Sequence, residues 1–291
     1  MKRKLSISYM IRRFVFEALT CLLLCTVIFG GAGVSTHAED GVYPSPKELH
    51  SNYFKSDAAL GKYVDKELLA HRKTIVFYSD RGDLMWYGLP EYPTCRLERY
   101  SVMLTSVRHK FTATVEQQPY FYYKYTVRPV YKNSKKNDRK FYNKVRSIAK
   151  KAKKKKSVRG RAKYINNYLV QQVRYKKNTK SISTAYTAIM EGNAMCQGYA
   201  DAFTVIARCA GLRTETVMGN ATYSRKYKPA YHAWNVVKRG RKWYNIDVTF
   251  NDVSSNETRY FMLGSKKFSN DHKLDSYYRR TGWTKRHPFK K

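Results

Sequence analysis

The chain has few acidic residues and few cysteines. It carries 21 aspartates and glutamates against 57 lysines and arginines, so its net charge at pH 7 is +36. This excess is larger than solubility requires and indicates attraction to polyanions. The five cysteines include no Cys-x-x-Cys pair and the seven histidines are scattered. These patterns argue against a structural zinc site, and we expect neither a metal nor another cofactor.

The N-terminus has the pattern of a secretory signal peptide. Five basic residues lie within residues 1–13, and an apolar run follows from Phe14 to about Val34. Thr36 and Ala38 then stand at the minus-three and minus-one positions of a cleavage site. We expect residues 1–38 to be removed and the protein to be secreted or associated with the cell envelope. The alternative is a retained transmembrane anchor, since the run is long enough to span a bilayer. No second run is long enough, so no integral membrane domain is expected after cleavage.

Removal of this leader leaves three cysteines, Cys95, Cys196 and Cys209. An odd number in an exported protein indicates a free thiol. Cys95 and Cys209 could pair and leave Cys196 free, although the sequence does not establish that pairing. Cys209 has no histidine or acidic motif around it and is interpreted as a core residue.

Cys196 lies where a thiol can be activated. The apolar spacing after Asp201 predicts a buried helix that ends at Gly211. Cys196 therefore lies at or just before the first turn of this helix. A helix N-terminus stabilises an anion and lowers the pKa of a thiol.

His232 and Asp247 are expected to meet across a β-hairpin. Residues 231–237 and 242–250 are rich in strand-forming residues, and Lys238-Arg-Gly-Arg241 connects them. With Arg239-Gly240 as a two-residue loop, or 238–241 as a four-residue loop, His232 lies directly opposite Asp247. Opposed side chains share one face with Cβ atoms about 5 Å apart. A bulged three-residue loop would shift this register.

Each of these residues alone has an ordinary structural explanation. A lone cysteine is most often a small buried apolar residue, and a lone histidine or aspartate near a strand end is usually structural or solvated. The combination of Cys196, His232 and Asp247 favours a catalytic site, because these are the parts that make, activate and orient a sulfur nucleophile.

The sequence around these residues resembles the transglutaminase-like superfamily, which includes transglutaminases, peptide N-glycanases and bacterial cysteine proteases. The resemblance covers about residues 139–275. It is carried by Ser183-Thr-Ala-Tyr186, Glu191-Gly192, Cys196-Gln-Gly-Tyr-Ala-Asp-Ala-Phe203, Ala210-Gly-Leu-Arg213, His232-Ala-Trp-Asn-Val236 and Trp243-Tyr-Asn-Ile-Asp247-Val-Thr249. It implies an α+β fold with a papain-like core, in which helices pack on an antiparallel sheet. It also implies a peptide or protein substrate, with Cys196 as nucleophile, His232 as general base and acid, and Asp247 as the orienting carboxylate.

The shared chemistry of such sites is attack of the thiolate on an amide carbonyl and formation of a thioester. The backbone N–H of Cys196 is the expected first donor to the oxyanion, and Asn193 and Gln197 are weak candidates for the second. Water would then give hydrolysis or deamidation, and a lysine amine would give a crosslink. The sequence does not distinguish protease, deamidase and acyl transferase.

The basic residues concentrate in one segment. From Arg139 to Met190 there are 17 lysines and arginines and no acidic residue. The stretch lacks interleaved aromatic residues and any recognised module, so no nucleic-acid partner is expected. It fits the solvated face of a helix whose apolar stripe includes Phe141, Val145 and Ile148. An anionic cell-envelope polymer or acidic lipid headgroup is the hypothetical partner, and lysine enrichment without a partner is the alternative.

The chain is expected to consist of three parts. After the signal peptide 1–38 comes an α+β region, 39–135, with a helix at about 56–71 and strands at 73–78, 100–105, 110–115 and 120–131. The polar segment 132–138 marks its end. Residues 136–291 form the expected catalytic domain, with helices at about 140–156, 158–174 and 184–191 and strands near 213–219, 231–237, 242–250 and 258–263. Helices followed by an antiparallel sheet predict the α+β class.

A structural role is the first interpretation for several other polar and aromatic residues. His272 is expected in a loop after the last strand, without a catalytic role. Trp234 and Trp243 either wall the substrate groove or pack in the core. Asp252 with Asn251 and Asp247 matches no metal-binding loop.

Three functions of different kinds fit these features. The first is an active cysteine enzyme acting on amides. The second is a catalytically silent transglutaminase-like fold that serves as a basic cell-wall-binding protein. The third is a structural exported protein whose thiol is incidental. The complete trio favours the first, because a protein that only binds has no physical need for all three residues.

Overall fold

The computed structural model describes most of the chain after its N-terminal segment. The described residues are 45–82, 84, 101–107, 111–118, 122–176, 184–223 and 228–291. The chain divides into two compact units, Met1–Pro44 and Ser45–Lys291, and every described residue belongs to the second. The expected signal peptide and Cys95 lie outside them. Within the described ranges, no helix has both the length and the apolar character that a bilayer crossing requires.

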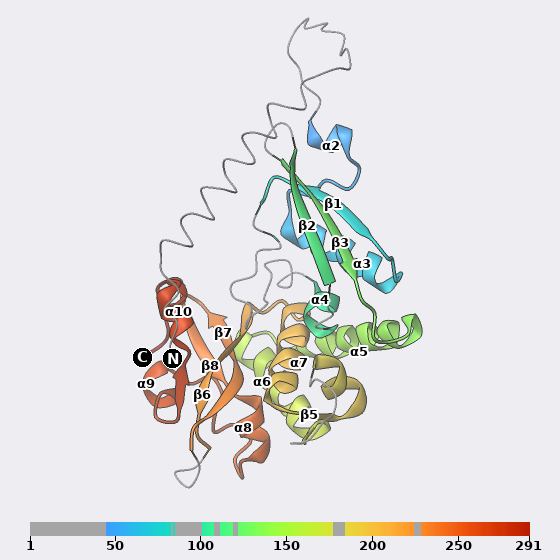
Figure 1. Ribbon diagram of the computed structural model, residues 1–291. Coiled ribbons are helices and arrows are strands. Elements are labelled where there is room, and N and C mark those ends of the chain that lie inside the picture. Colours follow the sequence, from blue (N-terminus) through green and yellow to red (C-terminus); the bar gives the residue numbers. More distant parts are fainter. Residues whose placement is uncertain are drawn as a thin grey trace, which may run out of the picture. The chain divides into compact units, whose positions relative to one another are not determined.

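The first part of this unit contains a three-stranded antiparallel sheet (Figure 1). Its elements in chain order are α2 (Pro46–Leu49), α3 (Asp57–Leu69), β1 (Ile75–Ser79), α4 (Val102–Val107), β2 (Phe111–Gln118) and β3 (Tyr122–Pro129). Strand β3 is central and pairs with β1 on one side and β2 on the other. The helix expected at 56–71 and the strands expected at 73–78, 110–115 and 120–131 are confirmed.

The strand expected at 100–105 is wrong, because this segment forms helix α4. Buried Asp65 accepts hydrogen bonds from the backbone N–H groups of Val102 and Met103, at 3.2 and 2.9 Å. Ser101 donates to the same carboxylate and accepts from the N–H of Leu104 at 3.0 Å. These two side chains satisfy the free N–H groups of a first helical turn. The tertiary contact with α3 therefore overrides the local β propensity.

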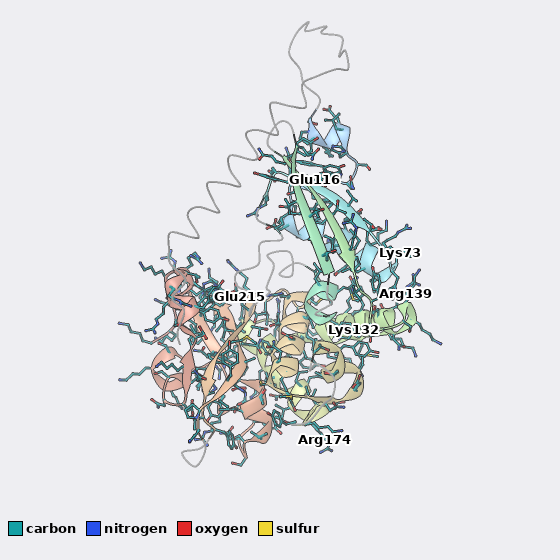
Figure 2. The ribbon with its side chains drawn as sticks, in the orientation of Figure 1. Lys73, Glu116, Lys132, Arg139, Arg174 and Glu215 are labelled. Atoms are coloured by element: carbon teal, nitrogen blue, oxygen red, sulfur yellow. The ribbon has the colours of Figure 1, made fainter. Side chains whose placement is uncertain are left out.

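The basic segment forms two capped helices, as expected. They are α5 (Lys135–Lys153) and α6 (Val158–Gln172), which begin after the capping residues Ser134 and Ser157. On α5 the buried residues recur at helical spacing and leave the lysines on the solvent side, where Arg139 extends outward in Figure 2. The buried set is Asp138, Phe141, Val145, Ile148, Ala149 and Ala152.

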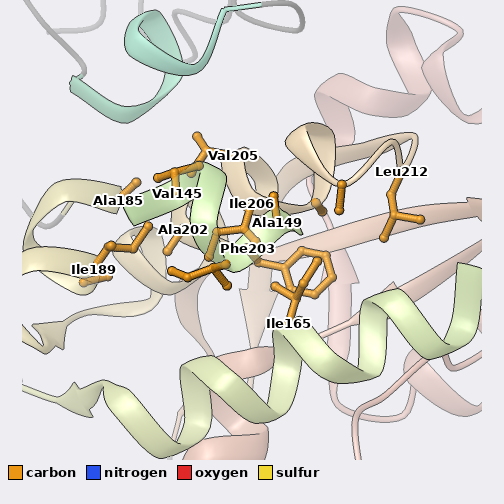
Figure 3. Close-up of a cluster of buried hydrophobic side chains, with 14 of the residues drawn as sticks. Val145, Ala149, Ile165, Ala185, Ile189, Ala202, Phe203, Val205, Ile206 and Leu212 are labelled. Carbon is orange, nitrogen blue, oxygen red and sulfur yellow. The ribbon is translucent and has the colours of Figure 1, made fainter. Parts of the chain in front are cut away.

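Helix α7 (Cys196–Cys209) is the central helix of the core. Ten of its residues are buried, and it contacts α5, α6 and a strand of the second sheet. Figure 3 shows Phe203 and Ile206 of α7 among side chains from α5 and α6. The short helix expected at 184–191 is confirmed as a helical segment whose last turn, η3 (Thr187–Glu191), is a π-helix. It ends at Gly192, which has a φ of +69° that suits glycine.

The second sheet has four antiparallel strands in the order β8-β7-β6-β9. The strands are β6 (Thr214–Ala221), β7 (Ala230–Arg239), β8 (Lys242–Ile246) and β9 (His272–Leu274). Helix α7 packs against β6 and β7. A second apolar cluster, which includes Trp234, Trp243 and Trp283, joins the strands to the short helices α9 (Ser265–Phe268), α10 (Ser276–Arg280) and α11 (Trp283–Arg286). The α+β class and the packing of helices on an antiparallel sheet are confirmed.

Two of the expected strands differ in the structure. The strand expected at 242–250 ends at Ile246, because Asp247 accepts a hydrogen bond from the N–H of Phe250 and caps helix α8 (Val248–Val253). Residues 258–263 form turns, and only Leu263 makes a β-bridge, with Asn245. Buried Asn251 accepts the N–H of Tyr260 at 2.7 Å. This side chain provides the hydrogen bond that a neighbouring strand would otherwise make to the backbone.

One apolar cluster extends through both regions expected from the sequence. It contains Leu60 and Phe77 of the first sheet layer together with Phe141 and Phe203. The division of the chain at residue 135 remains a prediction of the sequence pattern.

Candidate active site

The thiol of Cys196 lies at the first residue of α7, as expected. The short strand β5 (Asn193–Ala194) directly precedes it and pairs in parallel with β4 (Arg174–Tyr175). This pairing fixes the backbone that leads into α7. Cys196 is a free, partly exposed thiol. Burial raises the pKa of this thiol, but a hydrogen bond and the charge of His232, with a bond from the Ala233 backbone, outweigh burial and lower it.

His232 on β7 is the group that faces this thiol. Its Nε2–H donates to Asp247 Oδ2 at 2.7 Å, so Nδ1 is the nitrogen left for Cys196. The side chain is 9% exposed. Burial lowers the pKa of His232, but the charge and hydrogen bond of Asp247 raise it by more. The lowered pKa of the thiol and the raised pKa of the imidazole favour a thiolate–imidazolium pair.

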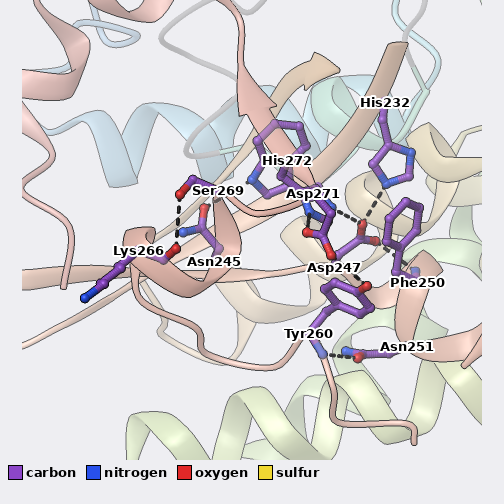
Figure 4. Close-up of polar contacts among 11 residues, drawn as sticks. His232, Asn245, Asp247, Phe250, Asn251, Tyr260, Lys266, Ser269, Asp271 and His272 are labelled. Atoms are coloured by element: carbon purple, nitrogen blue, oxygen red, sulfur yellow. Dashed lines mark hydrogen bonds and ion pairs between the residues drawn. The ribbon is translucent and has the colours of Figure 1, made fainter. Parts of the chain in front are cut away.

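Asp247 is completely buried and accepts three hydrogen bonds (Figure 4). Oδ1 accepts the N–H of Phe250 at 3.0 Å, and Oδ2 accepts from His232 and, at 2.9 Å, from His272 Nε2. Burial alone would raise the pKa of this carboxyl. The two imidazoles hold the pKa well below its usual range.

The expected hairpin register is wrong, although it placed the residues on the correct face. Arg239 pairs with Lys242, so the loop is Gly240-Arg241 rather than Arg239-Gly240. Gly240 has a φ of +58°, which a two-residue hairpin loop requires at its first position. The pairing moves by two residues, and side chains alternate with period two, so the face is preserved. Asp247 thus meets His232 from just beyond the end of β8, while Gly219 of β6 lies directly opposite His232.

The expected loop position of His272 is also wrong. This residue begins β9, pairs with Ala221 of β6 and bonds the same Asp247 oxygen as His232. The sequence gives little warning, because β9 has three residues and no run of β-branched side chains. The one local pattern that could have indicated a buried, charged histidine is the adjacent pair Asp271-His272. In the structure Asp271 Oδ1 lies 2.6 Å from His272 Nδ1.

The other residues considered from the sequence have structural partners. Asn193 donates to the Glu191 carbonyl, and Gln197 donates to Asp201, so each candidate oxyanion donor is engaged within its own segment. Trp234 and Trp243 are 2% and 3% exposed, which supports core packing rather than a groove wall. Asp252 accepts from the hydroxyl of Tyr199 at 2.7 Å.

Among the residues that the structure describes, one group of side chains has the spacing of metal ligands: His232, Asp247 and His272. Both Nε2 atoms already donate to one carboxylate oxygen. The hydrogen bonds therefore account for the cluster, and an ion would have to displace them.

Comparisons with known proteins give a match for the segment that carries these residues. Residues 143–248 match the family model of the transglutaminase-like superfamily, so this segment is similar to that superfamily. The matched segment contains Cys196, His232 and Asp247 and ends before His272. A search of curated proteins gave no match.

Several solved structures are similar to the chain. One is a transglutaminase with 16% identity and a TM-score of 0.35, whose match covers 66% of this chain and 55% of that one. Another is a candidate cysteine protease from Cytophaga hutchinsonii, with 13% identity, a TM-score of 0.33 and coverage of 57% and 68%. A third is the periplasmic domain of TgpA from Pseudomonas aeruginosa, with 14% identity, a TM-score of 0.31 and coverage of 49% and 65%. The chain thus spans about half the length of the first of these structures.

Proposed function

We propose that this chain is an exported cysteine enzyme that acts on peptide or protein amides through a thioester on Cys196. One observation carries the proposal: the thiol at the start of α7 meets His232, whose other ring nitrogen bonds buried Asp247 at 2.7 Å. This is the arrangement that activates and orients a sulfur nucleophile. The basic and apolar leader sequence supports the export of the protein.

The chemistry follows from the atoms that face one another. The thiolate of Cys196 attacks the amide carbonyl carbon, and the Cys196 N–H is positioned at a helix start to bond the oxyanion. The C–N bond breaks as His232 Nδ1 gives its proton to the leaving nitrogen. His232, now neutral, then takes a proton from water or an amine, which attacks the thioester and regenerates the thiolate. Water yields hydrolysis or deamidation, and an amine yields acyl transfer.

The pH dependence of Cys196 alkylation tests this proposal. Because its pKa is lowered, iodoacetamide should label Cys196 rapidly well below pH ~8.5, the pKa of an ordinary thiol. The rapid phase should be lost in His232→Ala, because the imidazolium that stabilises the thiolate is gone. Peptide mapping reads Cys209 in the same sample as an internal control, since burial raises its pKa to about 11. An ordinary thiol profile for Cys196 would contradict the proposal.

A cleft at the C-terminal end of α7 supports the second candidate, binding to an anionic envelope polymer. The cleft has a volume of about 900 Å³ and lies between α3, α4, α5 and α7. Among the described residues, five basic ones line it: Lys62, Arg146, Lys150, Lys153 and Arg208. The one acidic residue of this described lining, Asp65, is buried and bonded to Ser101 and to the backbone of α4. The charge facing solvent is therefore positive, which favours phosphate-rich polymers.

Charge reversal within the cleft should weaken polyanion binding. Each basic side chain near an anionic surface contributes about 1 kcal/mol, so Lys150→Glu with Lys153→Glu should reduce binding to immobilised polyphosphate by at least ~10-fold. Wild-type binding should also fall as salt rises. Lys135→Glu with Lys136→Glu is the matched control, because it makes the same charge change on α5 outside the cleft. Equal losses in both variants would indicate a general charge effect and remove the cleft as a site.

A further inference from the structure

Asp247 has a second imidazole partner that the chemistry above does not use. His272 Nε2 lies 2.9 Å from Asp247 Oδ2, and His272 Nδ1 lies 2.6 Å from Asp271 Oδ1. The second oxygen of Asp271 accepts the hydroxyl of Tyr260 at 2.9 Å. Figure 4 shows these contacts as one chain of bonds that begins at His232.

The two contacts define the protonation of His272. A carboxylate oxygen only accepts hydrogen bonds, so each ring nitrogen must carry a proton to bond one. An imidazole that donates at both nitrogens is an imidazolium. The charged and titratable groups that face it are Asp247, Asp271, His232 and Tyr260, and both carboxylates stabilise the cation. Burial alone would lower the pKa of His272, but these hydrogen bonds and charges raise it.

Aromatic rings fix His272 and exclude water from it. Its side chain has no exposed surface. Phe268 stacks on the ring at 3.9 Å, and Phe250 and Trp234 contact it at 4.9 and 5.3 Å. Charges in such a setting interact strongly, because little solvent screens them.

Gly219 allows β9 to bring His272 into this position. A Cβ on Gly219 would lie 2.2 Å from the carbonyl oxygen of Lys273, which is closer than any side chain tolerates. Only glycine permits this approach of β9 to β6. On its other side β6 pairs with β7, where Gly219 lies opposite His232. Gly219 therefore lies between the two strands that carry the imidazoles.

We propose that His272 is a positioning residue of this site, an imidazolium that keeps Asp247 ionised while His232 gives up and regains its proton. The inference rests on the proposed cysteine chemistry. At the thioester stage His232 is neutral, and a fully buried carboxylate without another cation would tend to take up a proton. His272 supplies that cation. Asp247 then continues to accept the Nε2–H of His232, which leaves Nδ1 free to act as the base.

Histidine-selective ¹⁵N NMR of the full protein carrying Cys196→Ala tests the charge directly. Without the thiolate, His232 loses one of the partners that raise its pKa, and the charge of His272 is read without that of Cys196. His272 should retain protons on both ring nitrogens at a pH above ~6.5, the pKa of an unperturbed histidine. A singly protonated His272 at that pH would overturn the proposal. The spectrum does not depend on turnover, so it separates this proposal from failure of the enzyme proposal.

Two substitutions separate charge from packing. His272→Gln keeps one N–H donor for Asp247 without the charge, whereas His272→Phe keeps only the aromatic volume. Thioester breakdown should slow by about 10- to 100-fold in His272→Gln, which is the typical loss when a residue that orients a functional side chain is removed. It should slow by more in His272→Phe. Thioester formation should slow less, because the His232 imidazolium pairs with Asp247 at that stage.

His287→Gln is the matched control. His287 is also buried, stacks on Trp283 at 3.9 Å and bonds a carboxylate, Glu215, but that carboxylate is not Asp247. The control should leave both steps unchanged. Equal slowing of formation and breakdown in His272→Gln, or equal effects of the two glutamine variants, would indicate a structural role alone. Wild-type Cys196 with ordinary thiol reactivity would instead overturn the enzyme proposal, whatever the state of His272.

Discussion

Replacement of Cys196 by alanine is expected to abolish amide turnover and leave the fold intact. The variant has no nucleophile, and losses on the order of 10⁴-fold or more follow removal of such a residue. The fold should survive because Cys196 is partly exposed at the first residue of α7, where alanine is a good helix former. Turnover is measured with a glutamine peptide, by ammonia release and by incorporation of a labelled amine, and with a protein substrate for peptide-bond cleavage.

The same assays distinguish the possible reactions and contain their own control. Ammonia release without amine incorporation indicates deamidation, incorporation indicates acyl transfer, and new termini indicate proteolysis. Cys209→Ala removes the other described thiol, at the opposite end of α7, and should leave turnover unchanged. Equal activity in wild type and Cys196→Ala would end the enzyme proposal.

Replacement of Asp247 should have the second largest effect, and the choice of residue separates catalysis from stability. Asp247→Asn can still accept the Phe250 N–H and cap α8, but its amide group presents hydrogens toward both imidazoles. His232 would then favour the wrong tautomer, and we expect a loss in turnover of ~10⁴-fold with the helix cap retained. Asp247→Ala loses the cap as well, which costs about 1 kcal/mol more in the free energy of unfolding.

Both Asp247 variants remove one carboxylate partner from two buried imidazoles, at a cost of about 3–5 kcal/mol. The acid side of the stability profile provides the check. The folded pKa of Asp247 is lowered, so its contribution is fully present above its unfolded pKa of ~3.9 and is lost as the pH falls toward the folded value. Urea unfolding between pH ~2 and ~6 should therefore show a weaker acid dependence in Asp247→Asn. An unchanged profile would mean that Asp247 is not held as an anion.

Local sequence patterns were sufficient to predict those helices and strands whose form depends on their own residues alone. The apolar stripe of α5, the helix that begins at Cys196, strands β6 and β7 and the start of β8 all follow from periodicity. The face shared by His232 and Asp247 was also predictable, because alternation along a strand survives a register error of two residues.

The features that were not predicted depend on contacts between distant segments. Helix α4 forms because Asp65 on α3 accepts its first N–H groups. His272 reaches the site through a three-residue strand whose position depends on the missing side chain of Gly219. No local window of sequence contains both members of any of these pairs.

The order of these residues along the chain affects how the protein is made. Cys196 comes first, and His232, Asp247 and His272 follow it in turn. Synthesis proceeds from the N-terminus, so α7 is made before any of the groups that lower the pKa of its thiol. The lowered pKa of Cys196 depends on His232 and the backbone of Ala233, both on β7. A nascent chain therefore carries an ordinary thiol, and its nucleophilicity is acquired only when the sheet is complete.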